Sequence, residues 1–234
     1  MRNAKSKDSM NSKIHPWRKC PLGQHWRKGH PMRTRSGNVV QRRGGCVQNR
    51  SGKDQIYTDE MELISQSEFD QLSGLPAGKR LGFSQGSKFD RGIRGWCKYW
   101  NDVLGGQDPI DPDLVKALIA TESGFRASVK IKDGKVQGHA TGLMQITDAT
   151  RLILSDEDGE LKDHLVNVNE SELKNPTFNI AAGIRWLFHK KSLASKRFGH
   201  EASWQETIMV YKGYKRLNHP QMLKFMQILQ ELKK

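Results

Sequence analysis

One acidic side chain continues a stripe that is otherwise apolar. Leu114, Val115, Leu118 and Ile119 recur at helical spacing, and Glu122 extends the same stripe one turn later. Partial burial disfavours the charged form of a carboxyl group, and a carboxylic acid that stays neutral near pH 7 can donate a proton in catalysis. The same spacing also fits a glutamate that reaches solvent at a helix end, so spacing alone leaves both interpretations open.

A second set of side chains that could bind a metal lies near the N-terminus. It consists of Cys20, His25, His30 and Cys46. Two thiolates and two imidazoles can complete a tetrahedral, structural zinc site. Their gaps match no common zinc-finger spacing, so free thiols or a Cys20–Cys46 disulfide are the alternatives. The third cysteine, Cys97, falls on an apolar helical face and is expected in the core.

Charge divides the chain into two parts. Among 234 residues there are 39 Lys or Arg and 25 Asp or Glu, which gives a formal net charge of +14. Residues 1–55 hold 14 of the basic residues and two acids, Asp8 and Asp54, so they carry +12 of that charge. This asymmetry predicts a basic N-terminal arm beside a nearly neutral domain. Such an arm could meet nucleic acid, an anionic membrane surface or an acidic cell-wall polymer, or stay a solvated tail.

Hydropathy and motif content narrow the class of protein. Mean hydropathy is -0.72, and no run approaches the roughly 18 apolar residues of a membrane span. The first 17 residues show no apolar segment behind their charges, so no secretory signal is visible. Trp17 and Trp26 lie among cations and could stack on bases, but no RNA- or DNA-binding motif accompanies them. Nucleic acid is therefore not the expected partner.

The elements that would position these residues are mostly helices, which predicts a mainly α domain over residues 89–234. A linker with one short helix, Tyr57 to Leu72, is expected over residues 56–88. The expected helices of the domain cover 93–104, 112–122 and 148–154, and three more begin near Asn175-Pro176, Ser203 and Pro220. Asp111 and Asn175 are expected as N-caps, each before a proline, and Ser203 with Glu206 as a capping box. One small β-hairpin is expected within 129–136, with its turn at Asp133-Gly134.

Four short motifs follow one another along these elements: Ala120-Thr-Glu-Ser-Gly-Phe125, Gly142-Leu-Met-Gln-Ile146, Asn175-Pro-Thr-Phe-Asn-Ile-Ala-Ala-Gly-Ile-Arg185 and Val210-Tyr-Lys-Gly213. Together they resemble the soluble lytic transglycosylases, whose catalytic domain shares a lysozyme-like fold with goose-type lysozyme. The resemblance covers about residues 95–215 and does not extend to the basic arm. It implies an α+β lysozyme-like domain in which Glu122 is catalytic.

The resemblance also implies a reaction. The family cleaves the β-1,4 bond between N-acetylmuramic acid and N-acetylglucosamine in peptidoglycan and leaves a 1,6-anhydro end. Glu122 would give its proton to the glycosidic oxygen while the acetamido oxygen of the substrate stabilises the anomeric carbon. The carboxylate would then take the proton of the C6 hydroxyl as that oxygen attacks, so neither a protein nucleophile nor a cofactor is required.

By the same resemblance, four further residues would shape the sugar groove: Ser123 and Gln145 as lining, Met144 as floor, and Tyr211 as the group that orients the acid. Lys212 departs from the family pattern, which usually has an asparagine there that meets the acetamido sugar. A cation within reach of Glu122 would favour the ionised carboxylate and so oppose its role as an acid.

Two other interpretations stay open. A hydrolytic muramidase would replace the C6 hydroxyl by water and would need a second acid, for which Asp133 and Asp148 are the candidates. The second open interpretation is a non-catalytic glycan-binding module with a zinc- or nucleic-acid-binding arm. Lys212 favours this interpretation. In the leading interpretation the protein acts at the bacterial cell wall, in the periplasm, after delivery by a phage or a non-Sec export route. The arm would then hold it to an anionic wall or membrane-surface polymer or to a carrier protein.

Overall fold

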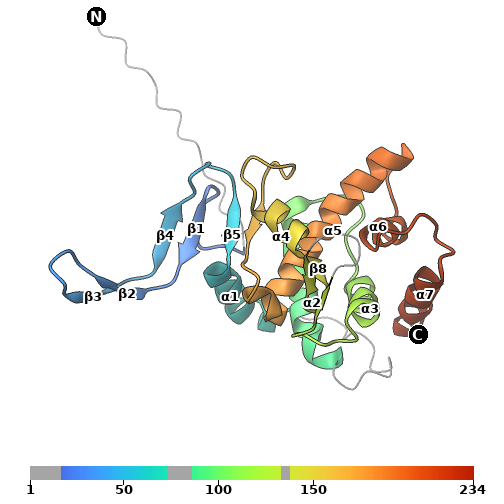
Figure 1. Ribbon diagram of the computed structural model, residues 1–234, viewed down its shortest axis with the longest axis horizontal. Helices are drawn as coiled ribbons and strands as arrows, with labels where there is room; N and C mark the ends of the chain where they lie inside the picture. The colour runs from blue at the N-terminus through green and yellow to red at the C-terminus, as the bar shows by residue number, and fades with distance from the viewer. Residues whose placement is uncertain (1–16, 73–85, 133–137) are drawn as a thin grey trace, which may run out of the picture.

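The computed structural model describes residues 17–72, 86–132 and 138–234. These residues form mainly α-helices around one core, and a long β-hairpin projects to one side (Figure 1). The helices are α1 (Thr58–Ser67), α2 (Asp90–Leu104), α3 (Pro112–Glu122), α4 (Asp148–Ser155), α5 (Pro176–Phe198), α6 (Trp204–Tyr211) and α7 (Pro220–Leu232). The expected mainly α class is confirmed. None of the described helices is both long and apolar enough to cross a membrane.

Helix starts coincide with the capping residues identified in the sequence. The side chains of Asp111 and Asn175 each accept the backbone N–H two residues later, and each is followed by a proline at the first helical position. Ser203 and Glu206 form the expected capping box at the start of α6. These caps fix where α3, α5 and α6 begin, and they thereby set the register of the side chains along each helix.

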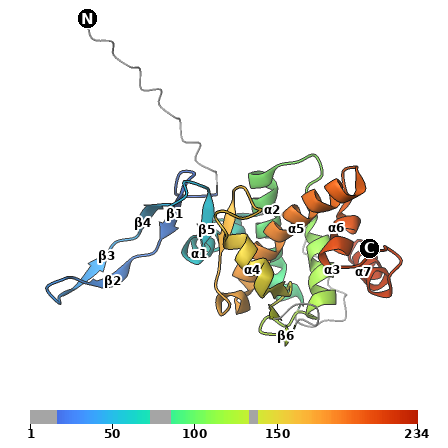
Figure 2. The same cartoon turned by 45° about the horizontal axis from the view of Figure 1, so that its top comes forward.

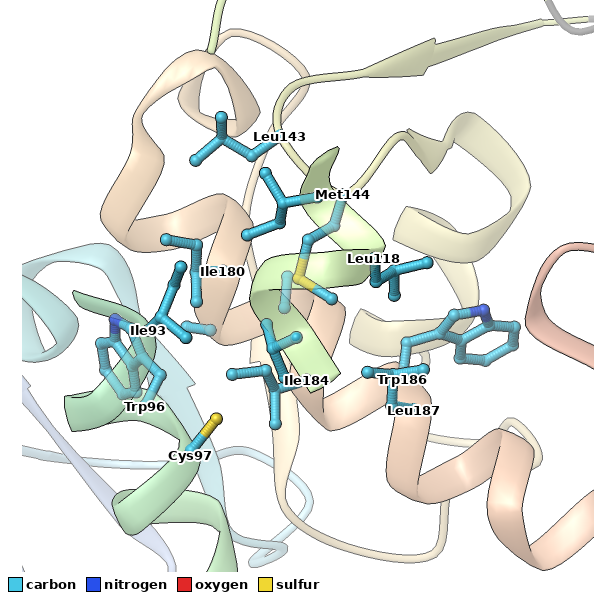
Figure 3. Close-up of a cluster of buried hydrophobic side chains, with 14 of the residues drawn as sticks. Ile93, Trp96, Cys97, Leu118, Leu143, Met144, Ile180, Ile184, Trp186 and Leu187 are labelled. Carbon is cyan, nitrogen blue, oxygen red and sulfur yellow. The ribbon is translucent and has the colours of Figure 1, made fainter. Parts of the chain in front are cut away.

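The core lies between α2, α3 and α5. Figure 3 shows Ile93 and Trp96 of α2, Leu118 of α3 and Ile184 of α5 converging on one cluster, and all four are fully buried. Cys97 joins the same cluster as a buried free thiol, which confirms its expected place in the core. Burying a large apolar side chain contributes about 1.5–3 kcal/mol, so this cluster anchors the helices that carry the site.

The strands are short and form four small sheets. They are β1 (Gln24–Arg27), β2 (His30–Arg33), β3 (Val39–Arg42), β4 (Gly45–Gln48), β5 (Gln55–Tyr57), β6 (Lys130–Lys132), β7 (His139–Thr141), β8 (Ile146–Thr147) and β9 (Leu165–Asn167). A hairpin is present here, but the strand that pairs with β6 is β7 at His139–Thr141, beyond the expected limit of residue 136. Strand β8 adds a third antiparallel strand. The expected turn at Asp133-Gly134 lies outside the described residues.

The N-terminal part is integrated into the core, which differs from the predicted division into arm, linker and domain. Ile56, Met61, Ile64 and Phe69 are buried in the same cluster as the central helices. Strand β5 also pairs in parallel with β9, more than 100 residues later. The predicted boundaries at residues 55 and 88 would therefore cut through one continuous core. Residues 73–85 of the predicted linker lie outside the described residues.

A buried ionic cluster ties the start of the chain to this core. The guanidinium of Arg18 donates two hydrogen bonds of 2.9 Å to Glu60 and one to Asp54, and it also bonds two backbone carbonyls. The side chains of Arg18 and Glu60 are 1% and 0% exposed. Burial raises the pKa of Glu60. For Asp54, burial acts in the same direction, but the hydrogen bond with His164 and the charge of Arg18 outweigh it and lower the pKa.

Cys20 and Cys46 form a disulfide, with Cα atoms 5.5 Å apart. This arrangement replaces the four-ligand zinc site considered from the sequence, because sulfurs joined to each other have no thiolate to offer a metal. His25 instead bonds the side chain of Asn49 at 2.7 Å, and His30 contacts a backbone carbonyl in the hairpin. Across the described ranges, no group of three or more His, Cys, Asp or Glu is placed to hold a metal ion.

The disulfide gives a first testable prediction. It closes a loop with a sequence separation of 26, and removing such a constraint from the unfolded chain costs about 3 kcal/mol. The double variant Cys20→Ser with Cys46→Ser should therefore lose about that much free energy of unfolding in a urea titration. Wild type in reductant should unfold at the same urea concentration as the variant. A variant as stable as the oxidised wild type would show that the bond adds nothing.

Candidate active site

Glu122 is the last residue of α3, and the chain turns sharply after it. Gly124 and Phe125 have φ angles of +58° and +63°. The left-handed region is unfavourable for a bulky side chain, and the ring of Phe125 offsets that cost by burying itself against Phe89, with ring centroids 6.2 Å apart. The packed ring therefore fixes the turn and, with it, the end of the helix that carries Glu122.

A lysine from the far end of the sequence pairs with this carboxylate. The Nζ atom of Lys212 lies 2.5 Å from the Oε1 atom of Glu122, and the two side chains are 5% and 18% exposed. Lys212 is the C-cap of α6, so the α5–α6 packing brings the cation to the end of α3. The expected cation within reach of Glu122 is thus present.

The charge of Glu122 acts on two tyrosines. Burial raises the pKa of Tyr211 well above its ordinary value and also raises that of Tyr214, and the negative charge of Glu122 adds to both shifts. Both hydroxyls therefore stay protonated near neutral pH. The hydroxyl of Tyr211 donates to the backbone carbonyl of Met144 at 2.5 Å. Tyr211 thus joins α6 to the segment before β8, next to Glu122.

The side chain of Asn179 holds the backbone of the segment that contains Met144. It is fully buried, its Oδ1 accepts the N–H of Met144 at 2.8 Å, and its Nδ2 donates to the carbonyls of Thr141 and Leu173 at 2.9 Å. Gly142 must be glycine here, because its φ is +80° and a Cβ would lie 2.2 Å from that Nδ2. Asn179 lies in the third sequence motif, but no role was predicted for it. A lone amide on the buried face of a helix is the signal that could have identified it.

The other predicted groove residues lie in three different settings. Met144 is fully buried among the core side chains beneath the segment (Figure 3). Gln145 is half-buried with a φ of +49°, and its amide donates to the carbonyl of Gly142 at 2.7 Å. Ser123 departs from its expected place, since it is 1% exposed and its hydroxyl donates to the carbonyl of Ile119 at 3.2 Å. That hydroxyl satisfies the end of α3 and is not offered to a groove.

Of the two candidates for a second catalytic acid, Asp148 lies within the described residues and Asp133 lies outside them. Asp148 accepts the backbone N–H of His139 at 2.8 Å and so helps to hold β7 in place. Of the predicted site residues, Lys212 is paired with Glu122 through its side chain.

Comparison with known proteins agrees with this geometry. A family model for the transglycosylase SLT domain matches residues 102–216, which include Glu122, Met144, Gln145, Tyr211 and Lys212. The match to the transglycosylase SLT domain covers a little under half of the chain.

One solved structure that resembles the chain is the 70 kDa soluble lytic transglycosylase SLT70 of Escherichia coli. The two are 16% identical, with a TM-score of 0.35, over 74% of this chain and 30% of the SLT70 chain. The protein thus spans about a third of the length of that enzyme. No curated protein sequence matches the chain.

Proposed function

We propose that this protein is a peptidoglycan lytic transglycosylase with Glu122 as its one general acid and base. The observation that carries the proposal is the setting of Glu122 at the end of α3 in an SLT domain. It is a largely shielded carboxylate that pairs with Lys212, and its charge acts on Tyr211, which bonds a segment held by Asn179. Such a carboxyl group can hold or accept a proton next to a bound sugar.

The reaction would proceed in two proton transfers. Protonated Glu122 donates to the glycosidic oxygen, and the bond between that oxygen and the anomeric carbon of N-acetylmuramic acid breaks. The acetamido oxygen of the same sugar supports the positive anomeric carbon. The Glu122 carboxylate then takes the proton of the C6 hydroxyl as this oxygen attacks the anomeric carbon. The products are a free N-acetylglucosamine end and a 1,6-anhydro end, and no water is consumed.

Lys212 is the ion-pair partner of Glu122, with its Nζ atom 2.5 Å from Oε1. This contact occupies one oxygen of the carboxyl group that would exchange protons with the substrate. We infer that the ion pair must open or shift when substrate binds.

Lys212→Asn restores the usual family residue and removes the ion pair with Glu122. The carboxyl group would then be free to reach the glycosidic oxygen, so kcat/KM should rise by about three- to tenfold. Rates of fragment release from labelled sacculi would measure it. Lys215→Asn, which removes a neighbouring exposed cation, is the control. A loss of rate in Lys212→Asn would contradict the assignment.

The reaction itself is tested by the ends that it leaves. Purified sacculi would be digested, and the released fragments separated and weighed by mass spectrometry. The proposal predicts anhydro-muramyl ends. Reducing muramyl ends, heavier by one water, would make the protein a hydrolytic muramidase. Binding to sacculi with no release would make it a glycan-binding module.

The disulfide supports the proposed place of action. Disulfides such as Cys20–Cys46 persist in oxidising compartments, for example the bacterial periplasm, and are rare in the reducing cytosol. Peptidoglycan lies in the same compartment. We therefore propose that the oxidised protein works at the wall.

A further inference from the structure

Strands β1 to β4 form one long hairpin that projects away from the helical body (Figures 1 and 2). Arg27 lies opposite Gly45 in the β1–β4 ladder, and His30 lies opposite Arg42 in the β2–β3 ladder. The two ladders keep the same register, so the hairpin is continuous apart from a short interruption between them. The body contacts its inner part, through β1 with α1 and β5 and through Lys28 with α1.

Two glycines allow the strands to come together at this interruption. A Cβ on Gly29 would lie 2.8 Å from the carbonyl oxygen of Arg42, and one on Gly44 would lie 2.9 Å from the ring of Trp26. Beside this close approach is a hollow of about 250 Å³, lined by Arg27, Lys28, His30, Arg42, Arg43, Gly45, Cys46 and Val47. Four of these eight lining residues are cations and none is acidic, so the hollow is suited to an anion.

The positive charge extends along the whole hairpin. The sequence from residue 17 to residue 53 contains no Asp or Glu, and Arg33 and Arg35 carry the charge on to the tip. Lys28 has an exposed partner on α1, Glu62, at 3.6 Å. Within the described ranges, the arginines of the hollow and of the tip form no ion pair with the protein. Their charge is therefore available to a partner.

Apolar side chains are exposed on the same hairpin. Val39, Val40 and Met32 at its outer end are 64%, 42% and 39% exposed. Of the nine large apolar side chains that are exposed in the described residues, five lie on the arm: Leu22, Met32, Val39, Val40 and Val47. A soluble polyanion needs only the cations. A lipid surface offers phosphate groups above apolar chains and so uses both kinds of side chain.

We propose that the hairpin over residues 24–48 binds the surface of an anionic phospholipid bilayer. The hollow lined by Arg27, Lys28, Arg42 and Arg43 takes a headgroup phosphate, and Val40, on the same strand face as Arg42, enters the interface. Val39, on the other face of the strand, adds apolar surface at the outer end. The hairpin would thus hold the protein at a membrane that borders the wall. This binding does not depend on the chemistry of Glu122, so it is tested apart from any glycan cleavage.

The test is sedimentation of the full-length, oxidised protein with vesicles of phosphatidylglycerol and phosphatidylcholine, with phosphatidylcholine vesicles as the comparison. Each cation near such a surface strengthens binding by about fivefold. The double variant Arg42→Gln with Arg43→Gln should therefore partition about 25-fold more weakly. Lys196→Gln with Lys224→Gln removes the same charge from α5 and α7 and should change partitioning less than about twofold.

A second double variant separates lipid from other polyanions. Val39→Thr with Val40→Thr keeps the shape and charge of the hairpin and removes only apolar surface. It should bind the anionic vesicles at least about fivefold more weakly and bind duplex DNA and sacculi as wild type does. The proposal is overturned if vesicle binding is unchanged in the arginine variant. It is also overturned if the valine variant binds vesicles as wild type does, which would indicate a plain polyanion site. Melting curves by circular dichroism establish that each variant is folded.

Discussion

Glu122→Gln is expected to slow the release of peptidoglycan fragments by about 10²–10⁴-fold, the contribution of general acid–base catalysis. Glutamine keeps the size of the side chain but can neither protonate the leaving oxygen nor accept the C6 proton. The substitution also removes the negative charge that pairs with Lys212, so this ion pair is lost from the fold. Initial rates of dye release from labelled sacculi would measure the effect.

Two comparisons make this result specific. Glu231→Gln changes an exposed glutamate on α7 and should leave the rate within about twofold. Binding of Glu122→Gln to sacculi, measured by sedimentation, should stay close to that of wild type, since the reaction and not the docking of the glycan is lost. A variant that retained more than about a tenth of the wild-type rate would contradict the role given to Glu122.

Arg18→Met is expected to lower the free energy of unfolding by about 3–5 kcal/mol, although Arg18 lies far from the site. The substitution leaves Glu60 and Asp54 buried without the cation that they share, and breaking a buried pair from one side is costly. Because Ile56 and α1 belong to the same core as the central helices, the loss should appear as one cooperative shift in urea. It should not appear as melting of a separate arm.

The neighbouring Lys19→Met is the matched control, because Lys19 is exposed and should cost less than about 1 kcal/mol. If Arg18→Met does not fold, the triple variant Arg18→Met, Asp54→Asn and Glu60→Gln provides the measurement, since it removes the buried charges together. It should recover part of the stability. An Arg18→Met protein as stable as the Lys19→Met protein would show that the cluster does not hold the arm to the core.

Much of the helical fold could be predicted from local sequence. The cap residues Asp111, Asn175 and Ser203 mark helix starts through bonds to their own next turns, so they need no knowledge of distant contacts. The proximity of Lys212 to Glu122 could be expected as well, because the two residues lie in motifs whose order resembles one family. In both cases the signal is contained in a few neighbouring residues.

The arm could not be predicted in the same way. Arg18 adds to a count of basic residues, yet its partners are Asp54 and Glu60, on both sides of the expected boundary. Net charge reports on the surface of a segment and not on which of its side chains are buried. The β5–β9 pairing and the hydrogen bonds of Asn179 join residues that are far apart or of unremarkable type. Such contacts depend on tertiary packing that no local pattern contains.

In the proposed mechanism, the C6 hydroxyl of the substrate, activated by Glu122, attacks the anomeric carbon in place of water. The most direct test is digestion of sacculi in water labelled with heavy oxygen, followed by mass spectrometry of the new muramyl ends. The proposed mechanism predicts anhydro ends with no heavy oxygen, because no water enters the product. One heavy oxygen atom at each newly formed muramyl end would contradict it and would make the protein a hydrolase.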